Sequence, residues 1–309
     1  MAIEKACPFF ILGRHGSLSF LRGQIFQSGI SKKRPDVATI KGNGIEIYYE
    51  EHGEGQPLLL IQGLSYATPM WYWQVAGLMD SFRVITFDNR GSGQSAKPDI
   101  PYSMKMFADD AVSLLDALKI SQVSVLGISM GGIIAQEVAL SYPGRVTHLI
   151  LCSTLFGGST ASQPDTETLA YLAEYQESVS DELSRLEIAY GTAPGFGERH
   201  PDRVAALVEF KRQSRPPRFA YFRQLMSAMG YVSETRLPSL SIPTLIIAGS
   251  EDRIIPPDNS RRLHQIIPNS KIKVFDNAGH HVHIEYPEEF NQAVIEFLSP
   301  TSIPGRLTI

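Results

Sequence analysis

Short apolar runs alternate with helical patterns along most of this chain. Six runs of four to six residues are rich in β-branched and aliphatic side chains, at 58–61, 82–87, 123–126, 146–151, 244–247 and 271–275. Short, almost continuously apolar runs are typical of strands that are buried on both faces of a sheet. The alternation therefore predicts an α/β protein with a mainly parallel sheet, right-handed crossovers, and its chemistry at the carboxyl ends of the strands.

Two local patterns refine this prediction. Asn43-Gly44 directly precedes the run at 45–50, which predicts a hairpin whose second strand is that run. At 103–118, apolar residues recur on one face and Ser103 stands where a capping side chain is needed. That spacing predicts an amphipathic helix beginning after Ser103.

The alternation stops between about Leu155 and Arg236. This interval has no good strand pattern, only helical stretches at 165–177, 181–190 and 202–229, interrupted by Pro194-Gly195 and Pro216-Pro217. Helices inserted at the strand ends would cover a site located there. We therefore predict a helical cap at 155–236, an α/β core at 37–154 and 237–300, an N-terminal extension at 1–36 and a C-terminal tail at 301–309.

The composition limits the partners. The chain has 309 residues, is 43% hydrophobic, and has a formal net charge of −4. No basic stripe stands out, so we expect no nucleic-acid partner. No apolar run approaches the roughly 20 residues that a membrane span needs, so we expect no membrane partner either. The oligomeric state is left open by the sequence.

The cysteines and the N-terminal extension indicate the compartment. Cys7 and Cys152 are too few for a disulfide framework or a cysteine-based zinc site, which favours a reducing, cytoplasmic location. Residues 1–36 are basic, and the apolar run at 8–12 is too short for a secretory signal. We expect this extension to be a poorly ordered tail.

The junction between the run at 123–126 and the helical pattern at 133–140 reads Gly127-Ile128-Ser129-Met130-Gly131. A serine between two glycines at a strand-to-helix turn is the pattern of a nucleophile elbow. Such a turn holds the serine in a strained backbone conformation that costs about 1–3 kcal/mol, and glycines two positions away prevent a collision. We therefore expect Ser129 to be a nucleophile, the alternative being a serine that only caps the helix.

A serine hydroxyl reacts only when a base takes its proton and an acid orients that base. Both partners should follow later strands. Asp252 comes after the run at 244–247, and His280 comes after the run at 271–275. Together with Ser129 they give the chain order Ser, Asp, His of a triad built on an α/β sheet. Glu251 and Asp258 are rival candidates for the acid.

Three histidines compete for the role of base. His280 directly follows Gly279 and takes the first loop position, whereas His281 and His283 are expected to be supporting or surface residues. The three could also form a metal site, but no spaced carboxylate or cysteine supplies the further ligands. We expect neither a metal nor an organic cofactor.

An oxyanion needs two hydrogen-bond donors held in place before the reaction. Leu64 lies in the loop after the run at 58–61, and Met130 begins the helix after Ser129, so we predict that the backbone N–H groups of these two residues form the oxyanion hole. The aromatic residues expected to line the substrate pocket are Tyr66, Trp71, Phe156, Tyr190 and Phe222.

From about Val37 to Leu298 the chain resembles the α/β-hydrolase fold superfamily, in the branch of capped esterases and enol-lactonases. The resemblance rests on the segments 62–64, 87–95, 127–132, 249–253 and 279–280. It implies a mostly parallel eight-stranded sheet flanked by helices, with an inserted helical cap. Many relatives have His-Gly where Gln62-Gly63 stands. Ser129 argues against epoxide hydrolase or haloalkane dehalogenase chemistry, because relatives with those activities carry aspartate at this turn.

The site residues and the resemblance together predict a serine hydrolase that cleaves a carboxylic ester or lactone of a small, apolar substrate. His280, oriented by Asp252, would take the Ser129 proton as the hydroxyl attacks the carbonyl, and water would then release the acid from the acyl-enzyme. Three alternatives stay open: an acyltransferase, a carbon–carbon bond hydrolase on the same triad, and a slow-turnover ligand receptor.

Overall fold

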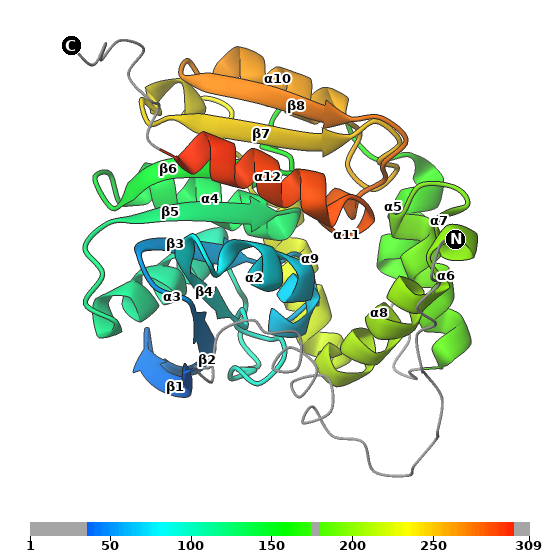
Figure 1. The fold of residues 1–309 in the computed structure, drawn as a ribbon, viewed down its shortest axis with the longest axis horizontal. Helices are drawn as coiled ribbons and strands as arrows, with labels where there is room; N and C mark the ends of the chain where they lie inside the picture. The colour runs from blue at the N-terminus through cyan, green and yellow to red at the C-terminus, as the bar shows by residue number, and fades with distance from the viewer. Residues whose placement is uncertain (1–35, 175–179, 300–309) are drawn as a thin grey trace, which may run out of the picture. The chain divides into compact units, whose positions relative to one another are not determined.

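An eight-stranded sheet forms the centre of the computed structural model, which describes residues 36–174 and 180–299 (Figure 1). The strands are β1 (Asp36–Gly42), β2 (Ile45–His52), β3 (Gln56–Ile61), β4 (Phe82–Phe87), β5 (Val123–Ile128), β6 (Val146–Cys152), β7 (Thr244–Gly249) and β8 (Ser270–Phe275). Their spatial order is β1-β2-β4-β3-β5-β6-β7-β8. The predicted extension at 1–36 and tail at 301–309 lie outside the described residues, except for Asp36 in β1.

The predicted sheet is confirmed, with one strand reversed. β2 pairs antiparallel with both β1 and β4, whereas every other pair in the sheet is parallel. Asn43 and Gly44 make the hairpin turn between β1 and β2 with φ values of 48° and 78°. The sheet is therefore mixed, although mostly parallel.

Helices on both faces explain why the central strands are so apolar. The flanking helices are α2 (Tyr72–Leu78), α3 (Met104–Ala117), α4 (Met130–Ser141), α10 (Asp258–Ile266) and α12 (Pro287–Leu298). Figure 1 shows α2 and α12 in front of the sheet and α3 and α4 behind it, and each of these two pairs is in contact. Leu59 and Leu60 of β3 point to opposite faces and both are fully buried.

Local sequence fixes where the helices begin. The Met106 N–H donates to Ser103 Oγ at 3.2 Å, so Ser103 caps α3 as predicted. None of the helices in the described segments has both the length and the apolarity needed to cross a bilayer.

Residues 155–236, here called the helical insertion, lie between β6 and β7. Their helices are α5 (Thr166–Ala173), α6 (Asp181–Gly191), α7 (Phe196–Arg199), α8 (Pro201–Ser214) and α9 (Arg218–Met229). Pro216-Pro217 separates α8 from α9, because a proline disfavours the helical conformation of the residue before it. The strands β5 and β6 point toward this side of the molecule (Figure 1). That the insertion acts as a cap remains a prediction.

One buried glutamine joins the helical insertion to the loops at the ends of two strands. The Gln224 amide on α9 donates to Arg90 O at 2.8 Å and to Ser92 Oγ at 2.9 Å, beyond β4. Its Oε1 accepts a hydrogen bond from the Ser65 N–H at 2.9 Å, beyond β3. Because buried polar groups are costly to leave unpaired, these three bonds fix α9 against both loops.

The backbones of β5 and α4 approach so closely that no side chain fits between them. A Cβ on Gly127 would lie 2.1 Å from Gly131 O, and a Cβ on Gly131 would lie 2.1 Å from Ile61 O. Both clashes are with backbone oxygens, which cannot rotate away as a flexible side chain can. The two glycines are therefore a packing requirement of the strand-to-helix turn.

We expect Gly127→Ala to lower the free energy of unfolding by about 3 kcal/mol or more, because the backbone of α4 must move to accept the methyl group. The matched control is Gly197→Ala, whose new Cβ would meet only Val204 Cγ2 at 3.8 Å, an ordinary contact. Urea unfolding of both variants checks this. Equal midpoints for the two variants would contradict the close approach described above.

Candidate active site

Ser129 sits at the turn from β5 into α4 with an unusual backbone conformation. Its φ is 55° and its ψ is −123°, in a region that residues with a side chain rarely adopt. Although Ser129 occupies the N-cap position of α4, its hydroxyl makes no capping hydrogen bond. The turn is held from its backbone side, because the Ser129 N–H donates to Cys152 O at 3.0 Å and the Thr154 hydroxyl donates to Ser129 O at 2.7 Å. The hydroxyl is left available for chemistry.

His280 and Asp252 form a buried pair at the ends of β8 and β7. His280 Nδ1 lies 2.8 Å from Asp252 Oδ2, and the two residues are 4% and 5% exposed. The other carboxylate oxygen accepts from the N–H groups of Ile254 at 2.9 Å and Ile255 at 2.8 Å. These bonds fix the carboxylate, and the carboxylate in turn fixes the imidazole ring.

The rival acids lie elsewhere. Glu251 is exposed, and Asp258 is an exposed residue paired with Arg261 at 2.6 Å.

Ser129 and His280 line the same cavity. Within the described segments no hydrogen bond joins the Ser129 hydroxyl to His280, a contact that often tightens only when substrate binds.

The loop after β3 passes directly over Ser129. A Cβ on Gly63 would lie 3.1 Å from Ser129 Cβ, a tight contact, so a glycine eases this approach. In the part of the chain that the structure describes, the N–H of Leu64 donates to no protein acceptor, and Met130 is the first residue of α4, whose N–H has no partner inside the helix. Both N–H groups are thus available to a developing negative charge.

Gln62 shows what replaces the histidine of many relatives. Its Oε1 accepts a hydrogen bond from its neighbour, the Gly63 N–H, at 3.1 Å, and its backbone oxygen accepts from Asn89 Nδ2 at 2.9 Å. The Gln62 amide nitrogen is buried and has no partner among the described residues. The side chain therefore supports the turn that presents Leu64.

A cavity of about 760 Å³ connects Ser129 and His280 to the helical insertion. Of the aromatic residues predicted to line it, Tyr66 and Phe222 do so. The structure places Trp71 and Phe156 in the core instead, where each is 0% exposed. Tyr190 is also outside the lining, stacked on Tyr171 with ring centres 4.2 Å apart.

Burial explains these differences. Trp71 packs beside the His283 ring at 5.3 Å, and Phe156 belongs to the main hydrophobic cluster. Sequence spacing could not separate an aromatic residue of a core from one of a pocket. The lining also includes Lys211 and Glu187, which the sequence analysis missed because charged residues in helices are usually at the surface.

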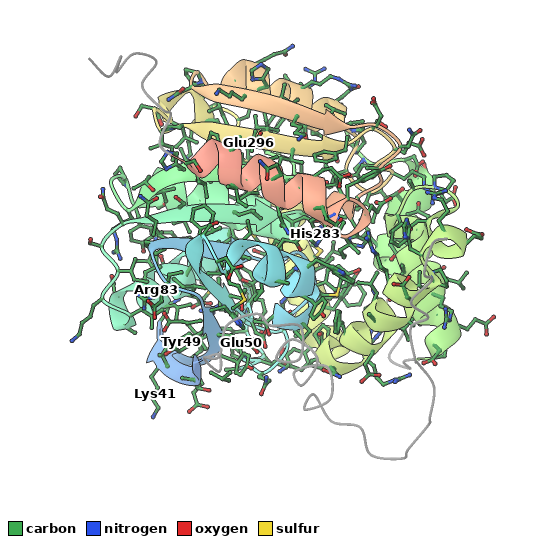
Figure 2. All side chains as sticks on the ribbon, in the orientation of Figure 1. Lys41, Tyr49, Glu50, Arg83, His283 and Glu296 are labelled. Carbon is green, nitrogen blue, oxygen red and sulfur yellow. The ribbon has the colours of Figure 1, made fainter. Side chains whose placement is uncertain are left out.

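His281 and His283 are buried rather than at the surface. Burial, and next to it the His280 charge, holds the pKa of His281 well below its usual value and lowers the pKa of His283 to about 3. His283, labelled in Figure 2, lies on the short helix α11 (Val282–Glu285). Both rings are neutral near pH 7. Among the described residues no cluster of three or more histidine, cysteine, aspartate or glutamate side chains could hold a metal ion.

Glu285 ties the histidine loop to the helical insertion. Its Oε1 accepts from the Gly279 N–H and its Oε2 from the Ala193 N–H, both at 2.9 Å. The His281 N–H donates to Gly191 O at 3.0 Å and adds a second tie. Burial raises the pKa of Glu285 from 4.5 to about 7 against the opposing effect of these two N–H donors. The loop that carries His280 is thus hydrogen-bonded to Gly191 and Ala193 of the helical insertion, through His281 and Glu285.

Glu285 makes the stability depend on pH. Because its folded pKa is above its unfolded value, the folded state keeps a proton that the unfolded state releases, and stability falls as the pH rises from about 4.5 to about 7. The loss is up to roughly 3 kcal/mol. Glu285→Gln removes this loss. The stability of the variant relative to the wild type should therefore increase from pH 5 to pH 8.

Urea unfolding at both pH values measures this difference. Glu288→Gln is the control, because the Glu288 side chain is 77% exposed and its one ion pair among the described residues is long, 3.9 Å to Arg203. Identical pH dependence for wild type and Glu285→Gln would show that the carboxyl group does not titrate in this range.

Comparisons with known proteins agree with this architecture. Residues 56–287 match a family model described as the alpha/beta hydrolase fold. A 2-hydroxymuconate semialdehyde hydrolase of Pseudomonas putida is 34% identical, covering 87% of this chain and 96% of its own. A 3-oxoadipate enol-lactonase of Acinetobacter baylyi is 29% identical, covering 83% and 94%. The structure of a thermophilic esterase from Thermogutta terrifontis is similar, with a TM-score of 0.74 at 30% identity, covering 85% of this chain and 98% of that chain.

Proposed function

This chain belongs to the α/β-hydrolase fold family, and we propose that it is a serine hydrolase that cleaves a carboxylic ester or lactone. The observation that carries the proposal is the pairing of His280 Nδ1 with Asp252 Oδ2 at 2.8 Å, in a cavity that Ser129 also lines. Ser129 is the nucleophile, His280 the base and Asp252 the acid that orients it.

The reaction proceeds in two steps. His280 takes the Ser129 proton as the hydroxyl oxygen attacks the carbonyl carbon, and it returns that proton to the leaving alcohol oxygen. The N–H groups of Leu64 and Met130 hold the oxyanion, an effect for which each such donor typically contributes about 10²–10³ in rate. Water, deprotonated by His280, then attacks the acyl-enzyme and releases the acid.

The cavity supports a substrate with an apolar part. Its lining includes leucine, isoleucine and methionine side chains from both the core and the insertion, among them Ile133, Leu172 and Leu225. The relatives named as an esterase and an enol-lactonase support the ester or lactone bond as the one cleaved. In this proposal the helical insertion acts as the cap that covers the apolar part of the bound substrate.

We expect Ser129→Ala to lower kcat for 4-nitrophenyl butyrate by about 10³-fold or more, because the step that forms the acyl-enzyme needs the hydroxyl. A fluorophosphonate probe should label the wild type covalently and leave Ser129→Ala unlabelled. Ser121→Ala is the control and should match the wild type in both assays, because Ser121 is exposed and precedes β5, whereas Ser129 follows the opposite end of that strand.

The same experiment tests the alternatives. If the wild type shows no turnover and is not labelled, the hydrolase proposal is overturned and a ligand receptor is favoured. Labelling with turnover only in the presence of an added alcohol or thiol would favour an acyltransferase.

A carbon–carbon bond hydrolase is a second candidate, favoured by one specific observation. The relative at 34% identity is named for 2-hydroxymuconate semialdehyde, which is an aldehyde and not an ester. The same serine, histidine and oxyanion donors could serve an aldehyde carbonyl. Comparing kcat/KM for 2-hydroxymuconate semialdehyde and for 4-nitrophenyl butyrate decides between the two, and a preference for the semialdehyde would replace the ester proposal.

The mouth of the cavity predicts a preference for longer acyl chains. Leu169, Met226, Met229 and Val232 line it and are 39%, 64%, 62% and 52% exposed. Exposed apolar side chains at a cavity mouth can cover methylene groups of a bound chain, each worth up to about 0.8 kcal/mol. We expect kcat/KM to rise from 4-nitrophenyl butyrate to the octanoate.

The double variant Met226→Ser, Met229→Ser should reduce this octanoate-to-butyrate ratio by about tenfold. Leu186→Ser is a matched control, because Leu186 is 63% exposed but does not line the cavity. An equal fall in the ratio for both variants would mean that the mouth has no part in chain selection.

A further inference from the structure

A buried lysine lies in the wall of the same cavity. Lys211 on α8 is 8% exposed, and its Nζ lies 2.8 Å from Glu187 Oε2 and 3.1 Å from Tyr66 Oη. The ammonium also lies 4.7 Å from the centre of the Tyr66 ring. Removing a cation from water is costly. No step of the proposed ester hydrolysis uses Lys211, so its burial at the cavity needs another reason.

Within residues 36–174 and 180–299, Glu187 is shared between Lys211 and a second cation, so it balances the charge of Lys211 only in part. Glu187 divides its oxygens between Lys211 and Arg215, which lies 3.3 Å from Glu187 Oε1. Burial acts to lower the pKa of Lys211, but Tyr66 and Glu187 outweigh burial and the pKa is raised, so the side chain stays an ammonium. Burial raises the pKa of Glu187, but the two cations outweigh it and the pKa is lowered.

Among the described residues, the other groups around the ammonium do not add a second negative charge there. His281, whose Nε2 lies 3.3 Å from Tyr66 Oη, is neutral because burial lowers its pKa. Glu174 also lines the cavity, but it is exposed and its charge is screened by water. Lys211 is therefore a positive site inside a largely apolar cavity.

Two hydrogen-bond donors at this place lack an acceptor. An ammonium carries three N–H groups, and within residues 36–174 and 180–299 the Nζ of Lys211 has hydrogen bonds only to Glu187 and Tyr66. Tyr171 also lines the cavity, and its hydroxyl makes no hydrogen bond in those segments. Burial raises the pKa of Tyr171, and the Lys211 charge opposes that rise, as expected for neighbouring groups.

We infer that Lys211 and Tyr171 bind a carboxylate that the substrate carries away from its scissile bond. A carboxylate would accept the free Lys211 N–H and the Tyr171 O–H in charge-assisted hydrogen bonds. The substrate class is then an acid monoester, or a lactone with a free carboxylate, joined by an apolar chain. This inference rests on the proposed function, because Ser129 and Lys211 must act on one bound molecule.

Two substrates of the same chain length, one with a free carboxylate and one with its neutral methyl ester, test the inference. Mono-4-nitrophenyl glutarate carries a free carboxylate, and 4-nitrophenyl methyl glutarate carries its methyl ester. The wild type should hydrolyse the acid with a higher kcat/KM than the methyl ester, mainly through a lower KM. Lys211→Met should lower the acid-to-methyl-ester ratio by about 10- to 100-fold, as expected for the loss of hydrogen bonds to a charged group.

Two further variants keep the test decisive. Arg212→Gln alters the next residue on α8, whose side chain is 48% exposed and pairs with Asp181 and Glu209, and it should leave the ratio unchanged. Tyr171→Phe removes one donor without a buried charge change, and it should lower the ratio even if Lys211→Met does not fold.

The outcomes separate this inference from the proposed function. A wild type that hydrolyses both esters equally, or a ratio that Lys211→Met and Tyr171→Phe leave unchanged, would overturn the carboxylate site while the hydrolase proposal stands. Absence of hydrolysis of either ester, together with no fluorophosphonate labelling, would overturn the proposed function and with it the carboxylate site.

Discussion

The contact of backbone with backbone at Gly127, Gly131 and Ile61 is the constraint on which the rest of this site depends. Three segments meet there: the end of β3, the end of β5 and the first turn of α4. Because no side chain separates them, the loop that carries Leu64 and the helix that begins at Met130 lie on either side of Ser129. Ser129 has its positive φ at this same close approach, and its side chain lines the cavity.

The sequence predicts features set by neighbours along the chain, and it predicts poorly those set by packing between distant segments. The strands and the start of α3 depend on local hydrophobicity and on the Ser103 cap, and both are confirmed. Trp71 and Phe156 illustrate the limit, because an aromatic side chain fills a core and a pocket equally well. Lys211 is the strongest case, since its burial is possible only where Glu187 and Tyr66, far away in sequence, meet it.

Polar contacts join the helical insertion to the core at each end of the site. Glu285 bridges Gly279 and Ala193, and Gln224 bridges Ser65 and Arg90. Gly279 directly precedes His280, and Ser65 directly follows Leu64, so these bonds hold the loops that carry both residues. A hydrogen bond buried in this way is costly to break without a replacement. The cavity wall and the reacting groups are therefore positioned together.

Gln224 also limits how freely the two parts of this molecule can be exchanged between relatives. The amide of this one side chain on α9 forms hydrogen bonds with both the loop after β3 and the loop after β4. A chimaera that takes residues 155–236 from another hydrolase would need a donor and an acceptor in this same arrangement, or the grafted helices would leave three buried groups of the host unmatched. Modular shuffling of such insertions is thus constrained by a single amide.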